Sequence, residues 1–140
     1  MTAKEYLQQI YLLDQTVNIN LDELQRLRDL SVKANATISD MPGSATRNTQ
    51  KMESAIVKMV DLEMKIDGEI DKLVDLKTKI RGEISEMPDV RYRFLLQARY
   101  INLMSWDTIA NDMALCKRQV LRLHSEALQE FDKVVTKCRD

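Results

Sequence analysis

The 140-residue chain has few of the residues that turn or crosslink a backbone: three glycines, two prolines and two cysteines. So few glycines and prolines leave few places where a helix must end. The two cysteines, Cys116 and Cys138, are too few for the disulfide framework of a small secreted domain. If both lie on one continuous helix, their separation of 22 residues spans about 33 Å, which excludes a bond within the chain. We therefore expect a reduced, cytoplasmic protein.

Long apolar runs and catalytic motifs are also missing. No window reaches the roughly 18 consecutive apolar residues that cross a membrane, and the N-terminal MTAKEYLQQIYLL lacks the pattern of a signal peptide. His124 is the only histidine, so neither a zinc set nor acid–base chemistry near neutral pH has its usual residues. Gly-rich phosphate loops, nucleophile elbows and HExxH motifs do not occur. We expect no enzyme, no cofactor, no metal site and no contact with a membrane.

What the sequence does contain is helical periodicity, because apolar residues recur at three- and four-residue steps. A capping box from Thr2 to Glu5 opens the first long helix. Its expected apolar face consists of Tyr6, Ile10, Leu13, Val17, Leu24, Leu27, Ala34 and Ile38. Poor helix formers over 16–20 and a second capping box from Asn20 to Glu23 leave open a break near Asn20.

A loop and a second long helix follow. Residues 39–48, SDMPGSATRN, contain a proline and a glycine and are expected to form a loop. From about Thr49 to Glu86 a 3-4-3-4 apolar spacing predicts a coiled-coil helix roughly 55 Å long. Its expected stripe is Met52, Ile56, Met59, Ile66, Ile70, Leu73, Ile80, Ile84 and Met87. Because this helix cannot bury the stripe alone, we expect residues 1–87 to form a long antiparallel helical hairpin, and two hairpins to pair as a dimer.

Residues 88–140 predict a module of three shorter helices after Pro88. The first is expected over Val90–Tyr100, because Val90, Phe94, Leu95, Ala98 and Ile101 are apolar at helical spacing. Ser105 can cap a second helix over 106–113, which is expected to bury Trp106, Ile109, Ala110 and Met113. The three residues 114–116 have the length of the turn in a helix-turn-helix, and Lys117 begins the last helix.

The last helix has two different faces. A helical wheel places an apolar group on one side: Val120, Leu123, His124, Ala127, Phe131 and Val134. The opposite side carries Arg118, Arg122, Ser125 and Gln129, with Gln119 and Glu126 at its edge. Arginine can pair with guanine or grip phosphate, and glutamine can pair with adenine, so this face is typical of a recognition helix in the major groove. We expect His124 to be a core or boundary residue, and Trp106 to pack against Phe94 and Val120 rather than stack on nucleic acid.

The charge distribution agrees with a modest nucleic-acid footprint in the last third of the chain. Residues 1–87 hold 12 basic and 15 acidic side chains, a net charge of −3, whereas residues 88–140 hold 9 basic and 7 acidic, a net charge of +2. This local excess would not hold DNA tightly from one copy. We therefore expect two copies to act together.

The run LLQARYINLMSWDTIANDMALCKRQVLRLHSEAL resembles region 4 of bacterial sigma factors. It is similar in the same way to the sigma-region-4-like regulators of phages and prophages of low-GC Gram-positive bacteria, including the ArpU/RinA-type late transcription regulators. The matching positions are Leu96, Arg99, Tyr100, Ser105, Ile109, Ala110, residues 113–116, Val120, Ala127 and Leu128. Two positions depart from the family pattern, because Ala114 stands where glycine is usual and Cys116 where a serine or threonine cap is usual.

The resemblance implies a transcription regulator of phage or prophage genes, which we expect to be sequence-specific and to act as a dimer. Double-stranded DNA is the expected partner, RNA polymerase is a candidate second partner, and dimer half-sites lie about 34 Å apart or a multiple of that. We expect DNA contacts from the last helix, through Lys117, Arg118, Gln119, Arg122 and Ser125, and the resemblance implies backbone contacts from Arg99 and Ser105. Nothing resembles the sigma region that melts promoters, so we do not expect a complete sigma factor.

Two alternatives belong to other functional classes. The chain could be a coiled-coil adaptor or assembly protein whose last three helices only cap the bundle. It could also be a DNA-packaging recognition subunit, which likewise combines a helix-turn-helix with helical hairpins. A ring-shaped oligomer would favour packaging, and the absence of duplex binding at low salt would favour the adaptor.

Overall fold

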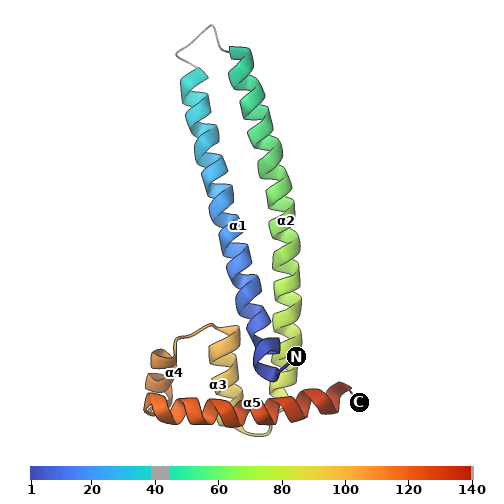
Figure 1. The fold of residues 1–140 in the computed structure, drawn as a ribbon, viewed down its shortest axis with the longest axis vertical. Helices are drawn as coiled ribbons and strands as arrows, with labels where there is room; N and C mark the ends of the chain where they lie inside the picture. The colour runs from blue at the N-terminus through green and yellow to red at the C-terminus, as the bar shows by residue number, and fades with distance from the viewer. Residues whose placement is uncertain (39–44, 140) are drawn as a thin grey trace. The chain divides into compact units, whose positions relative to one another are not determined.

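The structure, a computed structural model, describes the backbone of residues 1–38 and 45–139 and the side chains of residues 1–33 and 50–137. Within these ranges all regular structure is helical, which confirms the all-α prediction (Figure 1). The elements are α1 (Ala3–Ile38), α2 (Ala45–Ser85), α3 (Val90–Leu96), the π-helix η1 (Gln97–Ile101), α4 (Trp106–Met113) and α5 (Lys117–Arg139). They form two compact units, Met1–Leu13 with Leu73–Asp140, and Asp14–Lys72. The predicted division into a hairpin over residues 1–87 and a DNA-binding module over residues 88–140 concerns function and stays a prediction.

The unit Asp14–Lys72 contains parts of α1 and α2 that pack side by side. Its apolar cluster consists of Val17, Leu24 and Ile66, with Met59 and Leu62 partly buried beside them. Asn20 Nδ2 donates a hydrogen bond of 2.7 Å to Glu69 Oε2, and Arg28 Nη2 donates one of 3.3 Å to Glu63 Oε1. The later residue of α1, Arg28, bonds to the earlier residue of α2, Glu63, so the two segments run antiparallel. The helix α1 is continuous through Asn20, so it does not break there.

The second long helix differs from the prediction at its start and in its stripe. It begins at Ala45 rather than at Thr49, so residues 45–48 of the predicted loop are helical, while residues 39–44 of that loop lie outside the described residues. Alanine and arginine within 45–48 favour a helix, and no proline or glycine opposes it. Ile56 and Ile70 of the predicted stripe are exposed, because α1 is a single partner and covers only part of a coiled-coil face.

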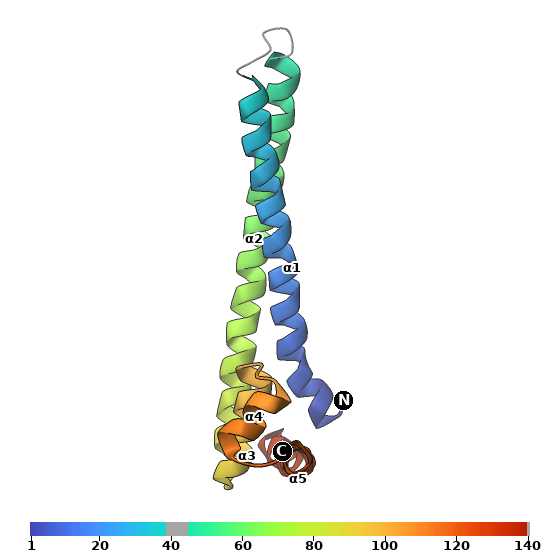
Figure 2. The same ribbon diagram turned by 90° about the vertical axis from the view of Figure 1, so that its left-hand side faces the viewer.

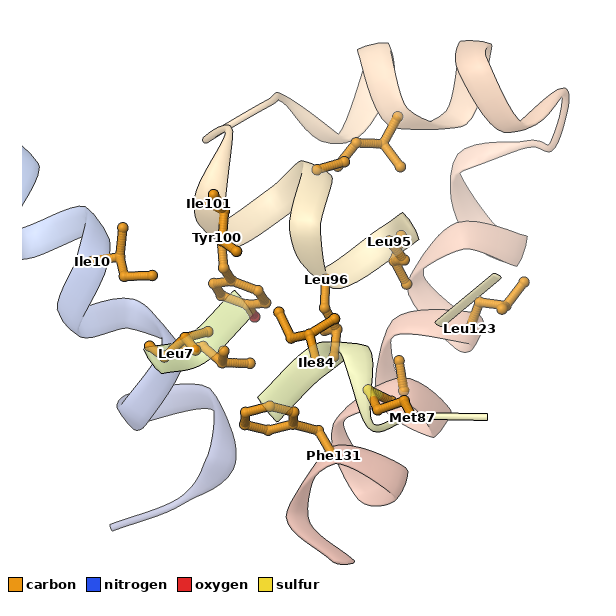
Figure 3. Packing of buried hydrophobic residues seen from close by; sticks show 14 of the residues in the cluster. Leu7, Ile10, Ile84, Met87, Leu95, Leu96, Tyr100, Ile101, Leu123 and Phe131 are labelled. Atoms are coloured by element: carbon orange, nitrogen blue, oxygen red, sulfur yellow. The ribbon is translucent and has the colours of Figure 1, made fainter. Parts of the chain in front are cut away.

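The unit made of Met1–Leu13 and Leu73–Asp140 holds the larger core. Figure 3 shows Leu7 and Ile10 of α1, Ile84 of α2 and Tyr100 of η1 turned toward a common centre, with Phe131 of α5 beneath them. The N-terminus of α1 is held by the predicted capping box, since Thr2 and Glu5 exchange bonds of 3.0 and 3.2 Å. Figure 2 looks almost along the axis of α5, which lies across the end of α2.

The segment predicted as one helix over Val90–Tyr100 is α3 followed by a π-helical turn. Asn102 N–H donates a hydrogen bond of 2.9 Å to Gln97 O, five residues earlier, and this spacing defines a π-helix. Val90 and Phe94, two of the apolar positions at helical spacing, are 66% and 41% exposed. The core-facing side of α3 is formed instead by two adjacent leucines, Leu95 and Leu96, which turns Val90 and Phe94 toward solvent.

The second short helix, α4, has the predicted bounds, and Ser105 caps it as expected. Ser105 Oγ accepts a hydrogen bond of 3.2 Å from Thr108 N–H. The helix ends at Ala114, whose φ of 56° and ψ of 39° are left-handed. The bonds Ala114 N–H to Asn111 O (3.2 Å) and Leu115 N–H to Ala110 O (3.0 Å) form a Schellman arrangement. This arrangement turns the chain so that α5 begins at Lys117.

Replacing Ala114 by glycine is expected to stabilise the protein. Alanine in the left-handed region is strained by its Cβ, and glycine removes that strain, which should raise the free energy of unfolding by roughly 0.5–1 kcal/mol. Urea unfolding followed by circular dichroism measures the change. Ala127→Gly, placed in the buried middle of α5, is the matched control and should lower the free energy of unfolding. If both variants lose stability, the strain attributed to Ala114 is absent.

Candidate nucleic-acid interface

The two faces of α5 separate as the sequence predicts. The inner face is buried or partly buried and consists of Val120, Leu123, His124, Ala127, Phe131 and Val134. Arg118, Arg122, Ser125 and Gln129 are exposed on the other face. Burial of the inner face fixes the rotation of α5 about its axis, so the identity of the outward residues follows from packing.

Arg118 and Arg122 are the cations best placed to meet a polyanion. Neither guanidinium forms an ion pair with a carboxylate in the described part of the chain. Lys117 differs, because its Nζ lies 3.7 Å from Asp107 Oδ1 on α4. That pair is exposed at both ends, so it is weak and a phosphate could replace the carboxylate.

Three of the predicted polar contacts already serve the helices themselves. Gln119 Oε1 accepts a bond of 3.1 Å from Cys116 N–H, so Gln119 supplies the glutamine half of a capping box at the start of α5. The side-chain oxygen that would accept a hydrogen bond from adenine is therefore already bonded within the helix. Ser105 Oγ lies 2.8 Å from Thr108 Oγ1 in addition to its capping bond, and Ser125 O–H donates to Leu121 O at 3.4 Å.

Arg99 is held against the loop that precedes α4. Its Nη1 donates to Met104 O at 2.9 Å, and its guanidinium carbon lies 4.4 Å from the centre of the Trp106 ring. Trp106 in turn meets the His124 ring edge to face, with centroids 4.7 Å apart. Phe94, one of the two packing partners predicted for Trp106, is 41% exposed, and the ring contacts of Trp106 are with His124 and Arg99.

His124 is a core residue, as predicted, being 7% exposed. Its Nε2 lies 2.6 Å from Tyr100 Oη, at hydrogen-bonding distance, and the two rings stack with centroids 5.7 Å apart. Burial lowers the pKa of His124 to about 4, with smaller contributions from the positive charges of Lys4 and Arg99. Burial likewise raises the pKa of Tyr100 to about 12. Both groups are therefore neutral near pH 7.

Arg91 is a further candidate that the sequence analysis did not single out. It lines a hollow of about 270 Å³ together with Leu115, Gln119, Arg122, Leu123 and Glu126. Its position beside Arg122 depends on how α3 packs on α5, and periodicity does not reveal this packing. Arg91 also forms an ion pair with Asp89, in which Arg91 Nη2 lies 3.4 Å from Asp89 Oδ2. The basic surface of this unit thus extends from α5 onto the start of α3.

Other site types find no support in the described ranges. No group of three or more histidine, cysteine, aspartate or glutamate side chains there is placed to hold a metal ion. None of the described helices combines the length and apolar character that a membrane span needs.

Acidification is expected to destabilise the fold through His124. The pKa of His124 is about 4 in the folded state against 6.5 for the unperturbed group, so the unfolded chain binds the extra proton first. The free energy of unfolding should therefore be highest above pH 6.5, fall between pH 6.5 and 4, and level off below. The loss attributable to this group is at most about 3–4 kcal/mol. Urea unfolding measured at intervals from pH 7 to pH 4 tests it.

The matched variant is His124→Gln, which keeps a polar group near Tyr100 but cannot titrate. Its unfolding free energy should fall less steeply than that of the wild type over the same pH window. An identical slope in both proteins would show that other groups cause the acid sensitivity.

Comparison with known proteins does not assign this surface. No protein-family model, no curated protein and no solved structure matches the chain. The interface is therefore defined by its own residues and geometry.

Proposed function

We propose that the protein is a sequence-specific DNA-binding transcription regulator in which α4, the turn over 114–116 and α5 act as a helix-turn-helix. The observation that carries the proposal is the division of α5 into a buried apolar face and an outward face with Arg118 and Arg122. In this role α5 enters the major groove, and its first two turns meet base edges and phosphates.

The surroundings of α5 support binding to the DNA backbone. Lys117 and Ser105 lie at the N-terminal ends of α5 and α4, where backbone N–H groups favour a phosphate. Arg91 extends the basic surface beside Arg122. Arg99 contributes mainly by holding the loop before α4, because its guanidinium already contacts Met104 and Trp106. We therefore rank Arg118 and Arg122 as the main DNA contacts.

The resemblance to sigma region 4 supports phage or prophage genes as the target and RNA polymerase as a second partner. The left-handed conformation of Ala114 favours the resemblance, since that family usually has glycine at this position. At Cys116, the backbone N–H is bonded by Gln119 Oε1, which is one of the two bonds of a capping box.

A homodimer is the form in which we propose that the protein binds. One α5 offers a small footprint, and two copies would double it at half-sites about 34 Å apart. On α2, Val57, Val60 and Met64 lie at steps of three and four residues and are exposed, with Met64 at 69%. On the helix wheel this stripe lies opposite Ile66, which packs in the cluster with α1. A second copy could cover it.

The same stripe favours one rival function, an adaptor or assembly protein that binds other proteins through α2. A phage DNA-packaging recognition subunit is a related alternative. Light scattering separates them, since a ring-shaped oligomer favours packaging and a dimer favours regulation. Duplex binding at low salt separates both from the adaptor.

Removing the two outward arginines is expected to abolish sequence preference. Fluorescence anisotropy with duplex fragments tiled across the source genome should show one fragment bound well above the rest. Arg118→Ala/Arg122→Ala should lose that preference. The slope of log affinity against log salt concentration should also become shallower, by the equivalent of about two phosphate contacts.

The control for this experiment is Lys133→Ala/Lys137→Ala, which removes two exposed cations from the far end of α5. It should keep the preferred fragment. If the folded wild type binds no duplex near 50 mM salt, the DNA-binding proposal fails.

Charging the exposed stripe of α2 is expected to dissociate the dimer. Val60→Lys/Met64→Lys places two like charges where a second copy would pack, so light scattering should give the mass of a monomer. Val90→Lys, a single charge at an exposed apolar position of α3, should leave the mass unchanged. A wild-type chain that is already monomeric at high concentration would contradict the dimer.

A further inference from the structure

A cavity of about 380 Å³ lies beside the loop between η1 and α4, away from the outward face of α5. Its volume is within the range of small-molecule sites in proteins. All of its walls belong to the unit Met1–Leu13 with Leu73–Asp140. The lining residues are Lys4, Gln8, Tyr11, Arg99, Tyr100, Leu103 and Trp106.

The cavity carries positive charge without a compensating acid. Lys4 comes from the first turn of α1 and Arg99 from η1, and no aspartate or glutamate is among the lining residues. The effect of these two charges reaches the protein interior, because both contribute to the lowered pKa of the neighbouring His124. An anion is therefore the ligand that this electrostatic environment favours.

Aromatic rings form the other part of the wall. Tyr11 is exposed and Trp106 is partly exposed, so a ligand can reach both rings. The guanidinium of Arg99 lies over the Trp106 ring, with 4.4 Å between its central carbon and the ring centroid, and both side chains line the cavity. Gln8 adds an amide with both a donor and an acceptor. The wall thus combines cations with stacking surfaces.

The loop side of the cavity is rigidly built, although its backbone is unfavourable. Leu103 has a φ of 55°, a left-handed conformation that leucine rarely adopts. It is fixed by bonds of 2.9 Å on either side, from Asn102 N–H to Gln97 O and from Met104 N–H to Ala98 O. Backbone strain that is held in place this way is common at ligand sites.

We propose that this cavity binds a small organic anion that carries one flat ring, of about the size of a nucleoside monophosphate. Lys4 and Arg99 hold the anionic group, and Tyr11 and Trp106 contact the ring. Neither Arg118 nor Arg122 lines the cavity, so this site does not depend on DNA binding by α5.

Trp106 is the only tryptophan in the chain, so intrinsic fluorescence reports directly on this site. The full-length protein is titrated with adenosine monophosphate, with 4-hydroxybenzoate, with adenosine and with inorganic phosphate. The two ring-bearing anions should change Trp106 fluorescence in a saturable way, and at least one of them should bind at least tenfold more tightly than both adenosine and phosphate. Calorimetry on the same samples confirms the dissociation constants.

Variants locate the binding. Lys4→Glu reverses one cation at an exposed position and should weaken the tighter ring-bearing anion at least tenfold, and Tyr11→Ala should weaken it as well. Lys79→Glu makes the same charge change at an exposed position of α2 that does not line the cavity, and it should leave binding unchanged. Circular dichroism verifies that each variant is folded.

Three results would overturn the proposal. The first is no saturable fluorescence change or heat with either ring-bearing anion at millimolar concentration. The second is equal affinity for adenosine and adenosine monophosphate together with no binding of 4-hydroxybenzoate, which would show that charge has no role. The third is an equal loss of affinity in Lys4→Glu and Lys79→Glu, which would show attraction to net charge alone. None of these results bears on duplex binding by Arg118 and Arg122, so the two proposals fail independently.

Discussion

The packing of the inner face of α5 is the constraint on which the interface depends. Burial of Leu123 and Phe131 on this face stabilises the fold by about 1.5–3 kcal/mol for each side chain. Rotating the helix would expose both side chains, and the free energy lost would exceed the gain from any surface contact. Phe131 reaches the first turns of α1, where its ring stacks on Tyr6 with centroids 6.2 Å apart. The position of Arg118 and Arg122 at the surface is therefore a consequence of burial on the opposite side, and it does not require the arginines to make any contact of their own.

Polar contacts around Arg99 and His124 give this packing its geometry. Arg99 joins the loop carbonyl of Met104 to the ring of Trp106, and Trp106 meets His124, which in turn lies at hydrogen-bonding distance from Tyr100. A neutral imidazole suits this site, because a charged one would be buried with little solvent to stabilise it. The left-handed residues Leu103 and Ala114 lie at the two ends of α4. Unfavourable backbone therefore occurs where the chain must turn sharply to place α4 and α5.

How much the sequence predicted depended on whether the signal was local. The Ser105 cap, the bounds of α4 and the two faces of α5 follow from spacing along a few turns, and all three are present. The π-helical turn after Leu96 and the exposure of Phe94 depend on which leucine meets the core, and periodicity alone does not choose between adjacent apolar residues. The bond from Cys116 N–H to Gln119 has a local signal, because a glutamine three residues after the capping position is typical of a capping box. The same glutamine also fits the edge of a recognition-helix face, so its position in the sequence does not decide between the two roles. The cavity joins Lys4 to Arg99, and no pattern in the sequence reveals a contact over such a separation.

An amide chemical-shift map would show whether the outward face of α5 contacts DNA, as we propose. Isotope-labelled protein would be titrated with its preferred duplex and, separately, with a scrambled duplex of equal length. We expect the largest changes over residues 117–125 and at Ser105, and larger changes with the preferred duplex. Residues 57–64 of α2 should be unaffected. Changes confined to α2, or equal changes with both duplexes, would contradict it.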